Sequence, residues 1–155
     1  MLRTLKPAPV DAVMENRQDV FQVGKELTVE QARKRFQEGQ QSLDYLLDHW
    51  EEVVENGGGD NVRRYIGTVG TSSGLYGIQK VMKVLQDDAD DIVEYTETMN
   101  EINACINGVD GSAYMAIFVV TSTSQTPPEK YFADAKVEAK RAQKAMAELA
   151  SQLKL

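Results

Sequence analysis

Four glycines and four hydroxyl residues gather in the eleven-residue stretch GTVGTSSGLYG, at positions 67–77. Glycine-rich loops of this composition can cradle a phosphate group with their backbone N–H groups. A Walker-type loop, however, needs a lysine directly after its final glycine, and this stretch contains no lysine. The dinucleotide fingerprint GxGxxG is absent as well. These spacings argue against a nucleotide site.

The glycines at 67, 70, 74 and 77 would align along one side of a helix, because their spacing is three, four and three residues. Each glycine in a helix costs about 0.5 to 1 kcal/mol relative to alanine, so close packing or a bend must compensate. We therefore expect a seam where a neighbouring helix packs against glycine backbone, or a bend. The alternative is a local break that presents to a ligand the hydroxyls of Thr68, Thr71, Ser72 and Ser73.

Few other side chains offer catalytic or metal chemistry. The chain has one histidine, His49, and one cysteine, Cys105, and we expect both to be structural residues. A di-iron bundle site requires Glu-x-x-His motifs on facing helices, but Leu46 stands three residues before the single histidine. Because no catalytic residues are paired, we predict neither enzymatic activity nor a bound cofactor.

An acidic cluster lies near the expected start of the third helix. Negative charge is favourable there because of the helix dipole, so we expect a solvated helix start and no metal site. Weak calcium binding by carboxylate oxygens is the alternative, although the EF-hand spacing is absent. The residues concerned are Asp87, Asp88, Asp90 and Asp91, followed by Glu94 and Glu97.

Basic residues gather on the expected last helix and beside the GGGD turn. The chain as a whole is acidic, with 24 acidic and 17 basic side chains and a net charge of -7. A general attraction to nucleic acid or to an anionic membrane is therefore not expected. A segregated basic face is instead a candidate surface for docking an acidic partner. The predicted docking residues are Arg63, Arg64, Lys130, Lys136, Lys140, Arg141 and Lys144.

Apolar residues recur at helical spacing along four long segments, and no window alternates as a strand would. Thr28 and Gln31 predict a capping box at the first helix start, and Asp60 can cap the second. The third keeps one apolar phase across NGVDG, so we expect a single long helix there. The stripes that we expect to be buried are Val29, Ala32, Phe36, Gly39, Leu43, Leu46, Trp50 and Val53 in the first segment, Ala89, Ile92, Thr96, Met99, Asn103, Ile106, Ala113, Ile117 and Val120 in the third, and Phe132, Ala135, Ala139, Ala142, Met146, Leu149 and Leu153 in the last. The expected helices run from Thr28 to Val53, from Asp60 to Leu85 with the glycine stretch inside, from Asp87 to Val120, and from Pro128 to Leu153.

The predicted fold is all-α: an up-down-up-down four-helix bundle with an N-terminal arm. Its 155 residues suffice for one domain, which we divide into an arm over 1–27 and a bundle over 28–155. The arm carries a possible short helix over 11–23. No apolar run reaches the ~18 to 20 residues that span a bilayer. The longest, Ala113 to Val120, fits one or two turns of a buried helix. The opening MLRTLKPAPVD has no apolar signal core, so it predicts neither an export signal nor an anchor.

Two segments resemble a known family. The run LLDHWEEVVENGGGDNVRRYIGTVGTSSGLYGIQKVMK, from Leu46 to Lys83, resembles the extrinsic photosystem II proteins of the thylakoid lumen of diatoms and related algae, which are related in fold to the PsbQ family. The ending PPEKYFADAKVEAKRAQKAMAEL is similar to the final helix of PsbQ, where a short break precedes a lysine and aromatic pair such as Lys130 and Tyr131. The similarity extends over Thr28 to Leu155.

The resemblance implies a bundle docked on the lumenal face of photosystem II. Such proteins shield the manganese cluster and help the enzyme retain calcium and chloride, supporting oxygen evolution without performing it. It also implies the photosystem core and other extrinsic subunits as partners, and the chloroplast thylakoid lumen as location, with the targeting segment absent from this chain and no segment spanning the membrane. The docking surface would comprise the basic last helix, Arg63, Arg64 and the arm. Unlike plant PsbQ, this chain is acidic and lacks a long proline-rich N-terminal stretch.

A second class of function also fits the composition. The chain could be a soluble helical-bundle carrier of a small ligand or metal ion, with Ser73, Thr96 and Asn103 facing a cavity. A carrier would show saturable binding of a small molecule to the purified chain. A docking protein would show none of consequence.

Overall fold

The computed structural model describes residues 26–121 and 126–155, with side chains placed through residue 119 in the first range. Within these ranges the chain is all-helical, with six α-helices and one short 3-10 helix. Most of the predicted arm lies outside the described residues, as does the possible helix over 11–23. The elements are α2 (Val29–Asp48), α3 (Trp50–Glu55), α4 (Gly58–Ile66), α5 (Ile78–Leu85), η2 (Gln86–Asp88), α6 (Ile92–Thr121) and α7 (Pro128–Gln152).

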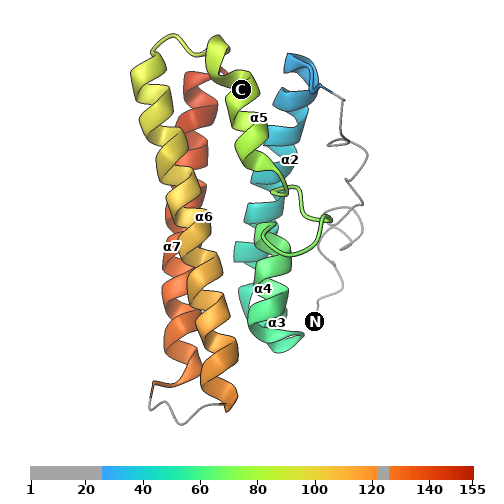
Figure 1. The fold of residues 1–155 in the computed structure, drawn as a ribbon, viewed down its shortest axis with the longest axis vertical. Helices are drawn as coiled ribbons and strands as arrows, with labels where there is room; N and C mark the ends of the chain where they lie inside the picture. The colour runs from blue at the N-terminus through green and yellow to red at the C-terminus, as the bar shows by residue number, and fades with distance from the viewer. Residues whose placement is uncertain (1–25, 122–125) are drawn as a thin grey trace, which may run out of the picture.

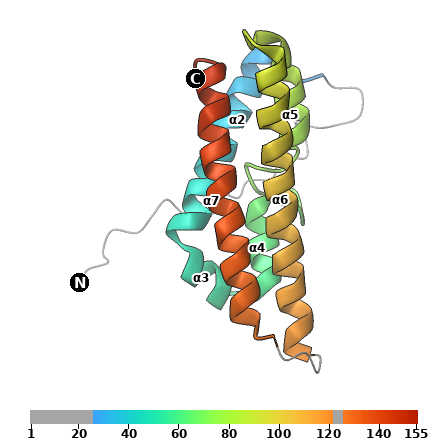
Figure 2. The same cartoon turned by 90° about the vertical axis from the view of Figure 1, so that its left-hand side faces the viewer.

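The helices lie nearly parallel to one long axis (Figure 1). The two longest helices, α6 and α7, run in opposite directions and pack side by side along their length. The rest of the molecule consists of α2 continued by α3 and of α4 continued by α5, as the view turned by 90° also shows (Figure 2). Helix α4 packs on α6, and α2 packs on both α5 and α7.

The start of α2 confirms the predicted capping box. The Thr28 hydroxyl accepts from the backbone N–H of Gln31 at 3.1 Å, while the Thr28 backbone N–H donates to the Gln31 side chain at 3.0 Å. These reciprocal bonds satisfy backbone donors that have no partner inside the helix. The predicted buried stripe is confirmed from Ala32 to Val53, whereas Val29 is exposed.

The first helix is interrupted at His49, where a single helix was expected. The carbonyl of Tyr45 accepts from the backbone N–H of His49 at 3.0 Å and from its ring Nδ1 at 2.8 Å. Since a carbonyl oxygen can only accept, Nδ1 carries the hydrogen. The two rings also stack with centroids 4.1 Å apart. The buried stripe nevertheless continues through Leu46 and Trp50, so the interruption leaves the packed face unchanged.

Helix α4 begins at Gly58, two residues before the predicted cap. Gly57 occupies the cap position, and Asp60 instead lies 3.6 Å from Arg63 within the helix. Gly59 packs directly against α6, because a Cβ there would lie 2.1 Å from the carbonyl oxygen of Ala113. Gly59 therefore lets the backbones of α4 and α6 approach closely.

Helix α6 is one continuous helix across Asn107–Gly111, as predicted, but it begins at Ile92 and not near Asp87. The predicted buried stripe of α6 is confirmed only in part. Met99, Ile106 and Ala113 are buried, whereas Ile92 is 49% exposed and Thr96 and Asn103 are half-buried. The buried face instead centres on Tyr95, Ile102, Cys105, Val109, Ala113 and Ala116.

Helix α7 confirms the expected series of small and apolar residues, all buried from Ala135 to Leu153, with Phe132 half-buried. Its alanines allow α7 to lie close to α6.

A buried hydrogen bond joins α6 to α5. The fully buried Tyr95 of α6 donates its hydroxyl to the backbone carbonyl of Met82 in α5. Burial raises the pKa of Tyr95 well above its ordinary value. None of the helices in the described ranges is both long and apolar enough to cross a membrane.

Candidate docking surface

The glycine stretch 67–77 is a break in the helix, not the seam of aligned glycines that its spacing suggested. Gly67 ends α4 with φ of 88°, and Gly77 precedes α5 with φ of 70°. Gly70 also has positive φ, at 74°. Three of the four glycines thus adopt the left-handed conformation, which other residues reach only with strain.

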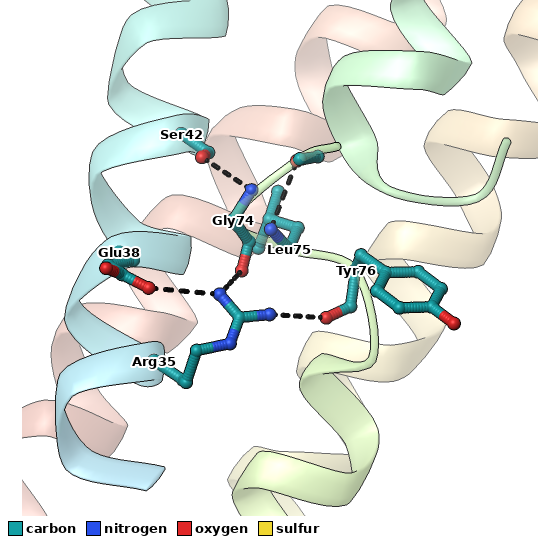
Figure 3. A network of polar contacts seen from close by, with 7 residues as sticks. Arg35, Glu38, Ser42, Gly74, Leu75 and Tyr76 are labelled. Carbon is teal, nitrogen blue, oxygen red and sulfur yellow. Dashed lines mark hydrogen bonds and ion pairs between the residues drawn. The ribbon is translucent and has the colours of Figure 1, made fainter. Parts of the chain in front are cut away.

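The fourth glycine, Gly74, supplies the close approach that was expected of all four. A Cβ at this position would lie 2.4 Å from both the Glu38 carbonyl oxygen and the Ser42 hydroxyl of α2. The backbone N–H of Gly74 donates to the Ser42 hydroxyl at 2.9 Å (Figure 3). The loop therefore packs against the surface of α2 through glycine backbone.

Arg35 of α2 also binds this loop. Its side chain is buried and donates to the carbonyls of Gly74 at 3.4 Å and Tyr76 at 3.0 Å (Figure 3). It also pairs with Glu38 at 3.2 Å. The planar guanidinium group can donate in two directions at once, so one side chain fixes two backbone carbonyls.

Hydroxyls of the loop are used within the chain. The buried Ser73 donates to the Tyr65 carbonyl and accepts from the backbone N–H of Leu75. Thr68 donates to the Asp110 carboxylate at 2.6 Å. These bonds assign Ser73 and Thr68 a structural role in the break. They do not gather around a ligand position.

The acidic cluster is dispersed among separate partners. Asp91 accepts from the backbone N–H groups of Val93 and Glu94, which caps the start of α6. Asp88 lies 3.6 Å from Arg33, and Asp90 lies 3.5 Å from Lys154. Within the described ranges, no group of three or more His, Cys, Asp or Glu side chains is arranged to hold a metal ion.

Arg63 and Arg64, predicted as docking residues, have different environments. Arg63 donates from Nε to Asp110 of α6 at 2.8 Å and lies 4.9 Å over the Tyr114 ring. Its side chain is 21% exposed, so it ties α4 to α6 more than it faces a partner. Arg64 is exposed and donates to the Asn61 side chain at 3.2 Å.

The basic residues of α7 spread around its outer surface. Lys136 lies 3.8 Å from Glu51 of α3. Arg141 lies 2.8 Å from Glu138 of its own helix and 3.9 Å from Glu101 of α6. Lys130 forms an ion pair along its own helix with Asp134 at 3.0 Å. The remaining two, Lys140 and Lys144, are exposed and form no ion pair within the described part of the chain.

Two surface hollows flank this basic surface. One, of about 400 Å³, lies beside His49 and is lined largely by carboxylates of α2 and α3 together with Lys136. The other, of about 140 Å³, lies between α6 and α7 beside Arg141 and Lys144. Neither is lined by Ser73, Thr96 or Asn103, the residues that a carrier would use.

The single cysteine, Cys105, is buried. Burial raises the pKa of its thiol, which disfavours the reactive thiolate.

One surface feature was missed by the sequence analysis. Tyr114, Met115 and Phe118 of α6 are 44%, 41% and 47% exposed, although the apolar run that contains them was expected to be buried. The rings of Tyr114 and Phe118 meet edge to face, with centroids 4.8 Å apart. Three large apolar residues within five positions are compatible with an interface, but an apolar run of this kind is equally typical of a buried helix segment.

Comparison with protein-family models, with curated proteins and with solved structures finds no match to this chain.

Proposed function

We propose that this protein is an extrinsic lumenal subunit of photosystem II that docks on the oxygen-evolving complex. In this role it shields the manganese cluster and helps retain calcium and chloride, and it performs no catalysis itself. The proposal is supported by the resemblance of Leu46–Lys83 and Pro127–Leu149 to the extrinsic proteins. The all-helical fold is consistent with it. The thylakoid lumen and the photosystem core belong to the same proposal.

The proposal includes a four-helix bundle as the architecture. Two of its four rods would be interrupted helices, α2 with α3 and α4 with α5, and the other two would be α6 and α7. Successive rods run in alternating directions, which supports the up-down-up-down order (Figure 1). The interruption in the second rod is the glycine loop that Arg35 and Ser42 hold against α2.

The observation that carries the docking role is the free positive charge on α7. Lys140 and Lys144 are exposed without an ion pair in the described residues, and Arg141 between them is 56% exposed. They lie on a chain whose net charge is -7, so this local positive charge is opposite in sign to the net charge of the protein. Such a patch favours an acidic partner surface and orients the approach to it.

Changing Lys140, Arg141 and Lys144 together to alanine is expected to weaken binding to salt-washed photosystem II membranes about tenfold. Each exposed charge contact contributes roughly 0.5 kcal/mol, so three of them contribute about 1.5 kcal/mol, close to the 1.4 kcal/mol that corresponds to a factor of ten. Because exposed charges are screened by salt, the variant should also bind with a weaker dependence on ionic strength. The measurement is a binding isotherm at several chloride concentrations.

The matched control removes the same charge elsewhere. Lys34 on α2 and Lys80 and Lys83 on α5 are exposed, and their triple change to alanine should leave the isotherm within twofold of the wild type. Equal loss in both triple variants would attribute the effect to net charge and not to α7. Unchanged binding in the α7 variant would rule out this docking surface.

A further inference from the structure

Gly111 is a helix-interior glycine with no packing partner among the described residues. It lies at the middle of the exposed face of α6, and a Cβ there would have no described heavy atom within 4 Å. Glycine in a helix interior is less stable than alanine, so the position has a cost without a compensating contact in the described part of the chain. A close approach by something outside the chain would provide the gain.

The exposed face around Gly111 carries one ion pair at its edge and is otherwise uncharged. Between Ala104 and Phe118 the sequence holds a single acidic residue, Asp110, whose carboxylate accepts from Arg63 and Thr68. A helix face that is exposed and largely apolar is suited to pack against another surface. Its exposed residues are Ala104, Asn107, Gly111, Tyr114, Met115 and Phe118.

On this face, small residues precede Gly111 and large residues follow it at matching distances along the helix. Ala104 lies seven residues before it and Phe118 seven after, while Asn107 lies four before and Met115 four after. We propose that α6 packs antiparallel against α6 of a second copy of this chain, with the twofold axis at Gly111. The operation then places each large side chain opposite a smaller one, and glycine opposite glycine, as a self-complementary interface requires.

The charges also favour this arrangement. Exposed Glu94, Glu97 and Glu101 all lie in the N-terminal part of α6, so an antiparallel pair keeps the two acidic groups apart. Glu101 lies ten residues before the axis, and its counterpart position in the partner is Thr121, the last residue of α6. Arg141, 3.9 Å from Glu101, offsets the carboxylate charge that would otherwise face the partial negative charge of a helix C-terminus.

The expected dimer is weak. The stripe from Ala104 to Phe118 covers about 21 Å of helix axis at 1.5 Å per residue. A contact of this length between single helices is smaller than the roughly 800 Å² per partner of a standard stable interface. Because a small contact gives weak affinity, we expect association only at high protein concentration, on the order of 100 μM. The inference does not depend on the proposed function.

The test is disulfide formation at the proposed axis. A Gly111→Cys variant at about 100 μM under mild oxidation should form a covalent dimer at least about tenfold faster than Val93→Cys, because only the axis brings a residue onto its own copy. Val93 is a matched control, since it is 65% exposed on the same helix. Wild type controls for Cys105, which is buried. Equal rates for the two variants would overturn the proposal.

A second measurement avoids any engineered thiol. In sedimentation equilibrium the wild type should shift toward dimer as its concentration rises to about 1 mM, whereas Gly111→Arg, which brings like charges together at the axis, should stay monomeric. A wild type that remains monomeric throughout would contradict the proposal. So would a Gly111→Cys thiol that is shielded from labelling only when stripped photosystem membranes are added, because that result would assign the face to the photosystem.

Discussion

Replacement of Gly59 by alanine is expected to destabilise the protein by about 3 kcal/mol, the upper part of the range for overpacking a rigid site. The added Cβ would lie 2.1 Å from the carbonyl oxygen of Ala113 and 2.8 Å from Cγ1 of Ile117. The first of these atoms belongs to the backbone of α6, which cannot rotate away as a flexible side chain can. Helix α4 must therefore move off α6. Urea denaturation followed by circular dichroism measures the free energy of unfolding.

Gly111→Ala is the matched control for this prediction. It makes the same change in a glycine of α6 where a Cβ meets open space, so we expect a gain of about 0.5 to 1 kcal/mol from helix propensity. If Gly59→Ala proved as stable as Gly111→Ala, the close packing of α4 on α6 would be incorrect.

Replacement of Arg35 by methionine is expected to cost about 2 to 3 kcal/mol, the usual loss when buried acceptors lose a charged donor. Methionine keeps much of the apolar stem but leaves the carbonyls of Gly74 and Tyr76 without this donor. Arg35→Lys should recover only part of the loss, because one ammonium group cannot reproduce the planar fork that reaches both carbonyls. Thermal unfolding of the three proteins gives the order of stability.

Hydrogen exchange locates the effect of the Arg35 change. The backbone amides of Gly74 and Ile78, which donate to Ser42 and to the Leu75 carbonyl, should exchange faster in the methionine variant. Lys34→Met, at an exposed neighbouring position, should change stability by less than about 0.5 kcal/mol. Equal effects of the two methionine variants would show that Arg35 does not hold the glycine loop on α2.

Helix α7 and most of α2 with α3 were predictable because their apolar residues occupy one narrow stripe. From Ala32 to Val53 and from Ala135 to Leu153, spacing alone identified most of the buried side chains, although it missed Arg35, Ser42, Ala145 and Ala150. The face of α6 was not predictable in this way. Apolar residues surround this helix on most sides, from Tyr95 through Val109 to Phe118, so periodicity selected a phase about one residue away from the true one.

The glycine stretch shows a different limit. Its three-four-three spacing is compatible with a helix, and nothing in the spacing reveals that Gly67, Gly70 and Gly77 take positive φ. The bonds that fix the break come from distant residues, Arg35 and Ser42 of α2. Sequence reasoning located the irregularity but not its form, because long-range contacts decide between a bend and a break.

The candidate docking residues illustrate the same point for charge. Composition identified the basic residues of α7 but could not distinguish Lys140 and Lys144, which form no ion pair with any described residue, from Lys130, which pairs with Asp134. Arg63 was expected to face a partner, yet it is committed to Asp110, forty-seven residues away in sequence. Which charges remain available is a property of tertiary packing.

The proposed role can be measured as oxygen evolution by salt-washed photosystem II membranes, titrated with calcium and chloride in the presence and absence of this protein. We expect the added protein to lower the concentrations of both ions needed for half-maximal activity, and we expect the Lys140, Arg141 and Lys144 triple variant to require more protein for the same effect. If the ion requirements stayed unchanged at saturating protein, the protein would not be an extrinsic subunit of this enzyme.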